Sequence, residues 1–344
     1  MIRKTAIFLI AVFILTICPL QTMADIRING KSFYSVLPGT PEWDNLGTVE
    51  AKKEACSISA EKLLSMTNEE LVYAIVDYPF LIDIFLCDDY SIPVNTLFKE
   101  CDALVELTNR REAVNQLMSF LRNSYDDNNN IVVDIYEFKL EAIMVLLSYS
   151  DKLSKDLTDS DVDFINSQSH MVRIKKSDNG LRIAYVYTPN GTQVVCETYT
   201  CSHSQSSFHS DMDNSAVLVY GVTLISGGSC RYNCHSYAWY SSSTSNTMWI
   251  NNPSAYMSDG SYYCVLSNMS SNSSSVYSGD KICYGNNSSP AHSAIVSSSS
   301  SSTALSNRYV KSKWGNAGVF SHTLSNVPSE YWYHGYYASV WRLN

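Results

Sequence analysis

The sequence has little charge, no basic excess and no long apolar run beyond its first residues. Charged side chains make up 17% of the 344 residues, below the quarter that is usual in globular proteins. The formal net charge is −9, whereas a nucleic-acid-binding surface needs a basic balance, so we expect no nucleic acid partner. Hydrophobic residues still make up 45% of the chain, which allows a sizeable core and excludes wholesale disorder.

The first 24 residues have the features of an export signal. Arg3 and Lys4 precede an apolar run that ends at Cys18, and Ala24 closes a short stretch with small residues. This pattern is typical of a secretory signal peptide over residues 1–24, cleaved after Ala24. The run is shorter than the roughly 18 residues of a membrane span, and no later run is long enough. We expect a secreted protein, extracellular or in the cell envelope, with no stable membrane insertion after signal removal.

The cysteines argue for a free thiol. The chain has ten, and removal of Cys18 with the signal leaves nine, so an exported chain keeps at least one free thiol or an intermolecular bridge. The sequence has no paired CxxC motifs, so we expect no structural zinc site. The chemistry considered below requires neither a metal nor a cofactor.

Residues 25–170 have helical patterns and no catalytic motif, which predicts a helical accessory domain. The apolar spacing and capping residues are those of amphipathic helices with a solvated acidic face. Helices are expected from a capping box at Thr67 to Pro79, over 91–107, from Asn109, over 134–150, and from a cap at Thr158.

The pattern changes near residue 171, and residues 171–344 are expected to form a second, α+β domain. Strand-like patterns cover 172–176, a hairpin over 181–200 that turns at Asn190 and Gly191, and 216–224. The serine run at 297–302 is expected to be a flexible turn. Residues 230–344 hold six basic and three acidic side chains, so the acidity lies earlier and the two domains differ in surface charge.

Cys234 follows a glycine pair in the segment 227–242. Gly227 and Gly228 end the preceding strand, and residues 235–240 form a buried helix, so Cys234 lies in its first turn. Backbone N–H groups at a helix N-terminus favour a thiolate and can hold a developing oxyanion. This pattern indicates a thiol nucleophile. The alternative is a structural disulfide between Cys230 and Cys234.

A thiol nucleophile also needs a base, and His292 is the best placed of seven histidines. His235 adjoins Cys234 and points in another direction on the helix. His292 opens a strand-like segment, 292–296, that follows another strand start at 279–284. The alternative is an ordinary imidazole at a strand edge.

The ordered set NCHSY at 233–237, GD at 279–280 and HSAIV at 292–296 resembles papain-like thiol hydrolases of the NlpC type, with CHAP-type amidases as relatives. The segment KSKWG at 311–315 and His322 resemble exported members of that group. The resemblance covers about residues 215–344. It implies a papain-like α+β catalytic domain with an antiparallel sheet, in which the cysteine begins a helix and the histidine lies on a strand.

The resemblance implies a role for each matching residue. Cys234 matches the nucleophile and His292 the general base. A third residue, which orients the imidazole, falls within 308–313, and we assign Ser312, with Lys313 or His322 as alternatives. Family members usually have His, Asn, Gln or Asp at this third position.

The same resemblance implies a substrate groove. Asn233 stands where many family members have Asp, and the tryptophans could equally be core residues. The candidate lining residues are Tyr232, Asn233, Trp249, Lys313, Trp314 and His322.

The predicted function is an exported cysteine peptidase or amidase. The Cys234 thiolate attacks an amide carbonyl, and His292 protonates the leaving amine and then activates water to hydrolyse a thioester. The resemblance implies a cell-wall peptide or protein substrate, such as peptidoglycan stem peptides. The alternatives are an acyl transferase of the same fold, or a non-catalytic binding or adhesion protein in which Cys234 is bonded to Cys230.

Overall fold

The chain combines an N-terminal set of helices with antiparallel sheets, which confirms the predicted α+β class. The computed structural model describes residues 32–125, 137–172, 182–198, 207–268, 276–297, 308–332 and 337–344. The predicted signal peptide at 1–24, residues 173–176 of one predicted strand and most of the serine run at 297–302 lie outside the described residues. None of the helices in the described part has the length and apolar character needed to cross a bilayer.

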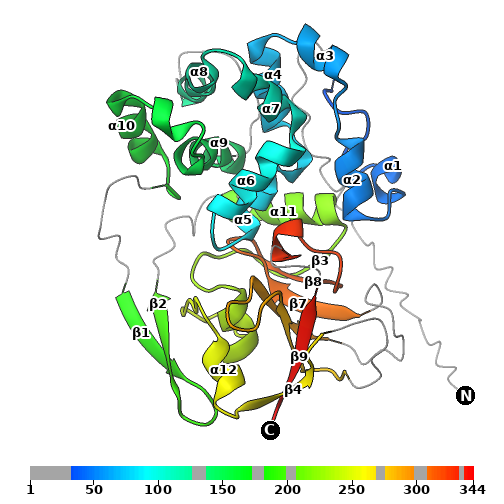
Figure 1. Cartoon of the computed structure of the whole chain (residues 1–344), viewed down its shortest axis with the longest axis vertical. Coiled ribbons are helices and arrows are strands. Elements are labelled where there is room, and N and C mark those ends of the chain that lie inside the picture. The colour runs from blue at the N-terminus through cyan, green and yellow to red at the C-terminus, as the bar shows by residue number, and fades with distance from the viewer. Residues whose placement is uncertain are drawn as a thin grey trace, which may run out of the picture.

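Short helices make up the first part of the chain (Figure 1). They are α1 (Pro41–Asp44), α2 (Val49–Ala55), α3 (Ala60–Ser65), α4 (Asn68–Val76), η1 (Pro79–Ile82), α5 (Asp83–Leu86), α6 (Ser91–Glu100), α7 (Asp102–Asn109), α8 (Ala113–Tyr125), α9 (Glu137–Tyr149), η2 (Ser154–Asp156) and α10 (Asp159–Gln168).

Both predicted helix caps are present. The Thr67 hydroxyl accepts from the Glu70 N–H at 3.1 Å, and the Glu70 carboxylate accepts from the Thr67 N–H at 2.7 Å. Thr158 and Asp161 form the same reciprocal arrangement at the start of α10. Each pair satisfies N–H groups that a helix leaves unpaired at its start. These local signals fix where α4 and α10 begin.

The single helix predicted over 91–107 is wrong, because the chain forms two helices there. Cys101 has an extended backbone, with φ −98° and ψ 95°, and separates α6 from α7. The Asp102 carboxylate accepts from the Ile58 N–H at 2.9 Å and ties the start of α7 to another segment. The two helices then pack against different partners, α6 against α9 and α7 against α4. The apolar spacing of the sequence continues through Cys101, so it gives no sign that the helix is interrupted there.

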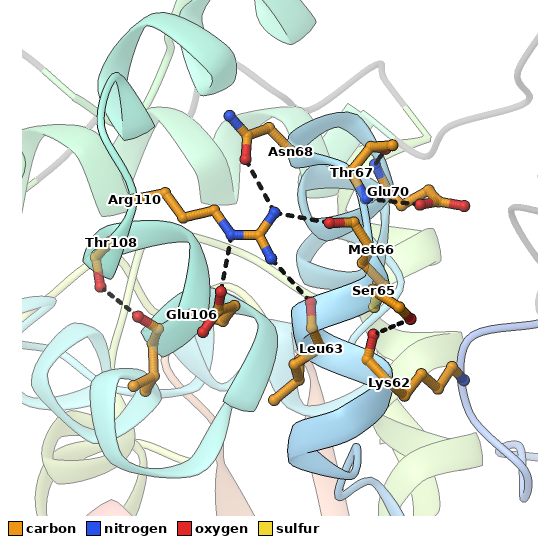
Figure 2. Close-up of polar contacts among 11 residues, drawn as sticks. Lys62, Leu63, Ser65, Met66, Thr67, Asn68, Glu70, Glu106, Thr108 and Arg110 are labelled. Carbon is orange, nitrogen blue, oxygen red and sulfur yellow. Dashed lines mark hydrogen bonds and ion pairs between the residues drawn. The ribbon is translucent and has the colours of Figure 1, made fainter.

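Arg110 joins the end of α7 to the turn between α3 and α4, as Figure 2 shows. Its guanidinium donates to the Glu106 carboxylate at 2.8 Å and to the Leu63 and Met66 carbonyls at 2.8 and 2.7 Å. It also donates to the Asn68 side chain at 3.1 Å. These contacts use four of the five N–H groups of the guanidinium, so Arg110 has a structural role.

Two antiparallel sheets follow the helices. The first is the hairpin of β1 (Arg182–Tyr187) and β2 (Gln193–Thr198), whose predicted turn is confirmed, with Gly191 at φ +86°. The second has the strand order β3-β8-β7-β6-β5-β9-β4. Its strands are β3 (Thr223–Ser226), β4 (Tyr262–Leu266), β5 (Lys281–Tyr284), β6 (His292–Val296), β7 (Tyr309–Lys313), β8 (Val319–Thr323) and β9 (Ala338–Leu343). Three more helical segments in this part are the π-helix η3 (Ser236–Tyr240), α12 (Ser254–Ser258) and η5 (Ser329–Trp332).

The strand predicted over 216–224 is wrong for most of its length. Residues 216–220 belong to α11 (Phe208–Tyr220), and only residues from Thr223 enter β3. A short apolar run fits a buried helix as well as a strand. Here α11 packs against η1 and α9, which buries Ala216 and Val219, and Gly221 ends the helix at φ +68°.

One buried core runs through both parts of the molecule. Its apolar side chains come from the helices, from α11 and from one face of the large sheet. Polar contacts cross the same boundary: the Trp43 indole donates to the Val219 carbonyl at 2.9 Å, and the Tyr220 hydroxyl donates to the Asp83 carboxylate at 2.6 Å. In Figure 1, α5 and α11 lie between the other helices of the N-terminal part and the sheet. The sheet part is therefore packed directly against the helical part.

Candidate functional site

Cys234 begins a helix, as its sequence context predicts. Residues 234 and 235 are helical and continue into η3. Cys234 is a free thiol, whereas Cys230 is disulfide-bonded. The alternative disulfide between Cys230 and Cys234 is therefore wrong. Cys234 is one of seven free cysteines among the described residues, so freedom alone does not single it out.

Asn233 fixes the position of Cys234 through four hydrogen bonds. Its side-chain oxygen accepts from the N–H groups of Ser236 at 3.1 Å and Ile250 at 3.2 Å. Its side-chain nitrogen donates to the Ile250 carbonyl at 2.8 Å and to the Asp88 carboxylate at 2.7 Å. An aspartate here would lose both donated bonds and would bring a second negative charge beside Asp88. This explains an asparagine at a position where the resembled family often has aspartate.

The Cys234 sulfur lies among groups that act on its charge in opposite directions. The backbone N–H groups of His235 and Ser293 face the sulfur and stabilise a thiolate, as does the Lys313 ammonium. Burial, which leaves Cys234 only 2% exposed, raises the pKa of the thiol, and the Asp88 carboxylate raises it further. Because the upward effects prevail, the thiol is protonated in this conformation.

Lys313 is a buried cation at the end of β7. Its ammonium donates to the carbonyls of Ser229 at 2.8 Å and Gly315 at 2.5 Å and lies over the Tyr232 ring. Burial lowers the pKa of Lys313 to about 8, against the opposing charges of Asp213, Asp88 and Cys234. The charge holds the loop before Cys234 in place and partly offsets the nearby carboxylates.

His292 lies at the start of β6, on the predicted strand. Its ring stacks on Tyr331 with centroids 3.7 Å apart, and Nε2 is buried without a hydrogen-bond partner. Burial lowers the pKa of His292, and the nearby His322 and His235 lower it further. The neutral ring thus has a free nitrogen of the kind that a general base needs.

The side chains of the predicted nucleophile and base do not face each other. Successive residues of a strand point to opposite faces. The Ser293 hydroxyl lies 2.8 Å from Nδ1 of His235, on the face toward η3, so His292 points to the other face and contacts Tyr331. Both Cys234 and His292 are described, and their side chains form no hydrogen bond. The roles of Cys234 and His292 stay predictions.

Ser312 is joined to His322, its neighbour across β7 and β8. Nδ1 of His322 lies 2.8 Å from the Thr323 carbonyl and so donates to it, which leaves Nε2 to accept from the Ser312 hydroxyl at 2.7 Å. Trp314 in turn donates to the Ser312 oxygen at 2.9 Å. Among the described contacts, none joins Ser312 to His292 by a hydrogen bond. The orienting role assigned to Ser312 stays a prediction.

Three potential metal ligands gather at the sulfur: atoms of Asp88, Cys234 and His235 lie within 4.8 Å of one another. The His235 nitrogens face the Ser293 hydroxyl and the Pro290 carbonyl, and burial lowers the pKa of His235 to about 4. A cation would have to displace one of those contacts and sit near the Lys313 ammonium. The donor set therefore fits a hydrogen-bonded polar cluster better than a metal centre.

The predicted substrate-lining residues differ in exposure. Tyr232, Asn233, Lys313, Trp314 and His322 are buried, and Trp249 is partly exposed. Trp314 belongs to the main core and packs edge-on against Tyr220. A groove-lining role for these residues stays a prediction.

Two neighbours of the thiol come from outside the motifs that sequence reasoning used. Asp88 belongs to the turn between α5 and α6, and its carboxylate raises the pKa of the Cys234 thiol. Tyr331 belongs to η5 and lies near enough to Cys234 for the two groups to interact electrostatically. Neither has a local sequence signal, because the tertiary fold brings these segments together.

A hollow of about 590 Å³ lies elsewhere, in the helical part, between residues 108–115 and 152–156. Its charged lining mixes Arg111, Lys152 and Lys155 with Glu112 and Asp156, all exposed. It contains no cysteine or histidine. The cluster around Cys234 therefore remains the candidate site.

Comparison of the chain with protein-family models, with curated proteins and with solved structures finds no match.

Proposed function

We propose that the chain is a cysteine hydrolase that cleaves amide bonds with Cys234 as nucleophile and His292 as general base. One observation carries the proposal: a free thiol lies in the first turn of a helix, faced by the N–H groups of His235 and of Ser293, the residue that follows His292 at the start of β6. The unpaired buried Nε2 of His292 supports the assignment of the base.

The reaction follows from these groups. The reaction requires the Cys234 thiol and the His292 ring to come within hydrogen-bond distance, which they do not in this structure. The thiol proton then passes to His292 as the sulfur attacks the amide carbonyl, and the backbone N–H groups of His235 and Ser293 stabilise the thiolate. The C–N bond then breaks, His292 protonates the leaving amine, and a thioester remains. Water, deprotonated by His292, hydrolyses the thioester and restores the Cys234 thiol. The resemblance to NlpC-type hydrolases suggests peptidoglycan stem peptides as substrates of an exported enzyme.

The test is digestion of purified peptidoglycan by the mature chain under reducing conditions, with products identified by mass spectrometry. Cys234→Ala and His292→Ala should each lower muropeptide release by about 1,000-fold or more. The matched control is Cys264→Ala, which removes an exposed free thiol on β4 and should leave release unchanged. Equal release by Cys234→Ala would refute the proposal. If neither the native chain nor any variant releases muropeptides, peptidoglycan is not the substrate.

A second candidate is a non-catalytic exported binding protein. The burial of Cys234 and the raised pKa of its thiol favour this candidate, because a nucleophile needs access and a thiolate. It predicts that Cys234 stays unreactive toward alkylating reagents under every condition that keeps the chain folded.

A further inference from the structure

We propose that the turn between α5 and α6, residues 87–90, is an autoinhibitory cap that keeps Cys234 covered. This inference rests on the proposed function, because a cap over Cys234 is autoinhibitory only if Cys234 is the nucleophile. Its test does not require hydrolysis. The argument starts from how this turn of the helical part is attached to the sheet part.

Asp88 brings the turn close to the sulfur. Its carboxylate accepts from the Asn233 side chain at 2.7 Å and lies within the cluster of atoms that includes the Cys234 sulfur and His235. Asp88 keeps an exposed surface, so it lies at the solvent side of the buried thiol. A carboxylate in this position opposes a second negative charge on the sulfur.

The rest of the turn is attached on both sides of Asp88. The Tyr331 hydroxyl donates to the Leu86 carbonyl at 2.6 Å, and the Asn316 side chain donates to the Tyr90 hydroxyl at 3.0 Å. The Asn316 N–H donates to the Phe85 carbonyl at 2.9 Å. Together with Asn233, these bonds attach residues 85–90 to three separate segments of the sheet part, beside the thiol.

The packing between these segments is too close for an added side chain. Gly315, at φ +42°, lies where a Cβ atom would come within 2.2 Å of the Phe85 carbonyl oxygen. A glycine is needed because only the missing Cβ lets the two backbones approach this closely. The close contact and the clamping bonds hold the turn against the sheet part, beside a Cys234 side chain that is only 2% exposed.

The charged and titratable groups around the sulfur come from four segments. They are Asp88 and Cys87 in the turn, Lys313 on β7, His235 beside the thiol and Tyr331 on η5. Asp88 is the carboxylate among them, and its removal leaves Lys313 and the backbone N–H groups to stabilise the thiolate. Movement of the turn away from Asn233 would therefore expose the sulfur. The same movement would take the Asp88 carboxylate away and so favour ionisation of the thiol.

The test is the rate at which iodoacetamide alkylates Cys234 in the folded full chain, measured by peptide mass spectrometry at neutral pH. Cys264, an exposed free thiol in the same chain, is the internal reference. Asp88→Asn should raise the Cys234 rate relative to Cys264 by about tenfold, which corresponds to one pKa unit. Tyr90→Phe removes one clamping bond without a change of charge and should raise the ratio by about twofold or more.

Asp89→Asn is the matched control, because it removes the charge of the neighbouring carboxylate. One oxygen of the Asp89 carboxylate accepts from the N–H and the hydroxyl of Ser91 at the start of α6. It should leave the ratio unchanged. A ratio that stays at the native value in both Asp88→Asn and Tyr90→Phe overturns the cap, and so does an equal rise in Asp89→Asn. If Asp88→Asn unfolds the chain, Tyr90→Phe decides alone.

The outcome separates the cap from the hydrolase. A faster alkylation without muropeptide release by Asp88→Asn supports the cap and counts against peptidoglycan hydrolysis. Faster release together with faster alkylation supports both. Release that depends on Cys234 at an unchanged alkylation ratio supports the hydrolase and overturns the cap.

Discussion

The helical part and the sheet part both bury charged groups, but they satisfy them differently. In the helical part, Glu141 accepts from the Ser169 hydroxyl and from the His170 N–H, both at 2.7 Å, in one short neighbourhood. In the sheet part, the groups around Cys234 come from distant segments, and His292 keeps an unpaired nitrogen. Buried polar atoms are nearly always paired, so an unpaired one calls for an explanation. Under the proposed function, the chemistry belongs to the sheet part, where the groups from distant segments meet at Cys234.

The largest effect is expected where the two parts meet. Gly315→Ala places a Cβ against the Phe85 carbonyl oxygen and should lower the free energy of unfolding by about 3 kcal/mol or more. Gly47→Ala is the control, because Gly47 also has a positive φ, +74°, but nothing lies within 4 Å of its added Cβ. It should cost about 1 kcal/mol from backbone strain alone. Urea unfolding measures both values.

Urea unfolding also tests whether the helical part and the sheet part unfold as one unit. Circular dichroism follows mainly the helices, while the indole fluorescence comes from six tryptophans, of which only Trp43 lies in the helical part. If the two parts share one core, both signals should change at the same urea concentration. Separate transitions, or equal costs for Gly315→Ala and Gly47→Ala, would show that the parts are independent.

A smaller effect should appear at acid pH. Burial lowers the pKa of His322 from 6.5 to about 4, so the unfolded chain binds this proton first as pH falls. The stabilising effect of a neutral His322 is fully present above pH 6.5 and is lost as pH drops toward 4, by up to about 3 kcal/mol. His322→Gln should therefore flatten the decline in unfolding free energy over that window by about 1.4 kcal/mol per pH unit.

The unfolding free energy of each variant must be compared with that of the native chain at the same pH. Burial raises the pKa of Asp213 to about 6, so protonation of Asp213 stabilises the folded chain as pH falls, which is opposite to the effect of His322. His170→Gln, which removes an exposed histidine, is the control and should leave the decline as in the native chain. An unchanged decline in His322→Gln would contradict the prediction.

The smallest effect is expected at a helix cap. Thr67→Ala removes one half of the capping box of α4 and should cost about 1 kcal/mol in urea unfolding. Thr158→Ala removes the equivalent hydroxyl at α10 and should cost about the same. Because both caps are local to the helical part, neither variant should alter the alkylation rate of Cys234. A change in that rate would mean that the helical part acts on the site as a whole.

Local signals predicted much of the fold. The capping boxes at Thr67 and Thr158, the hairpin turn at Gly191 and the strand that begins at His292 were all confirmed. Each depends on neighbours in sequence, such as a hydroxyl three residues before an N–H or a residue that tolerates positive φ. The helical start at Cys234 was confirmed for the same reason.

Apolar patterns were less reliable where packing decides. The run over 216–224 fits a strand, yet contacts with η1 and α9 make residues 216–220 part of α11. The run over 91–107 continues through Cys101, yet the chain breaks there so that α6 and α7 can reach different partners. Neither outcome has a cause within the segment itself.

The sequence by itself determined the α+β class, the helix start at Cys234 and the strand of His292, because these follow from local spacing and capping. Only the tertiary structure decided what surrounds the thiol. It left Cys234 free beside a bonded Cys230, turned His292 toward Tyr331, and brought Asp88 to the sulfur from 146 positions away in the sequence. Such contacts come from the packing of one shared core, in which segments without any local signal meet because their apolar faces must be buried together.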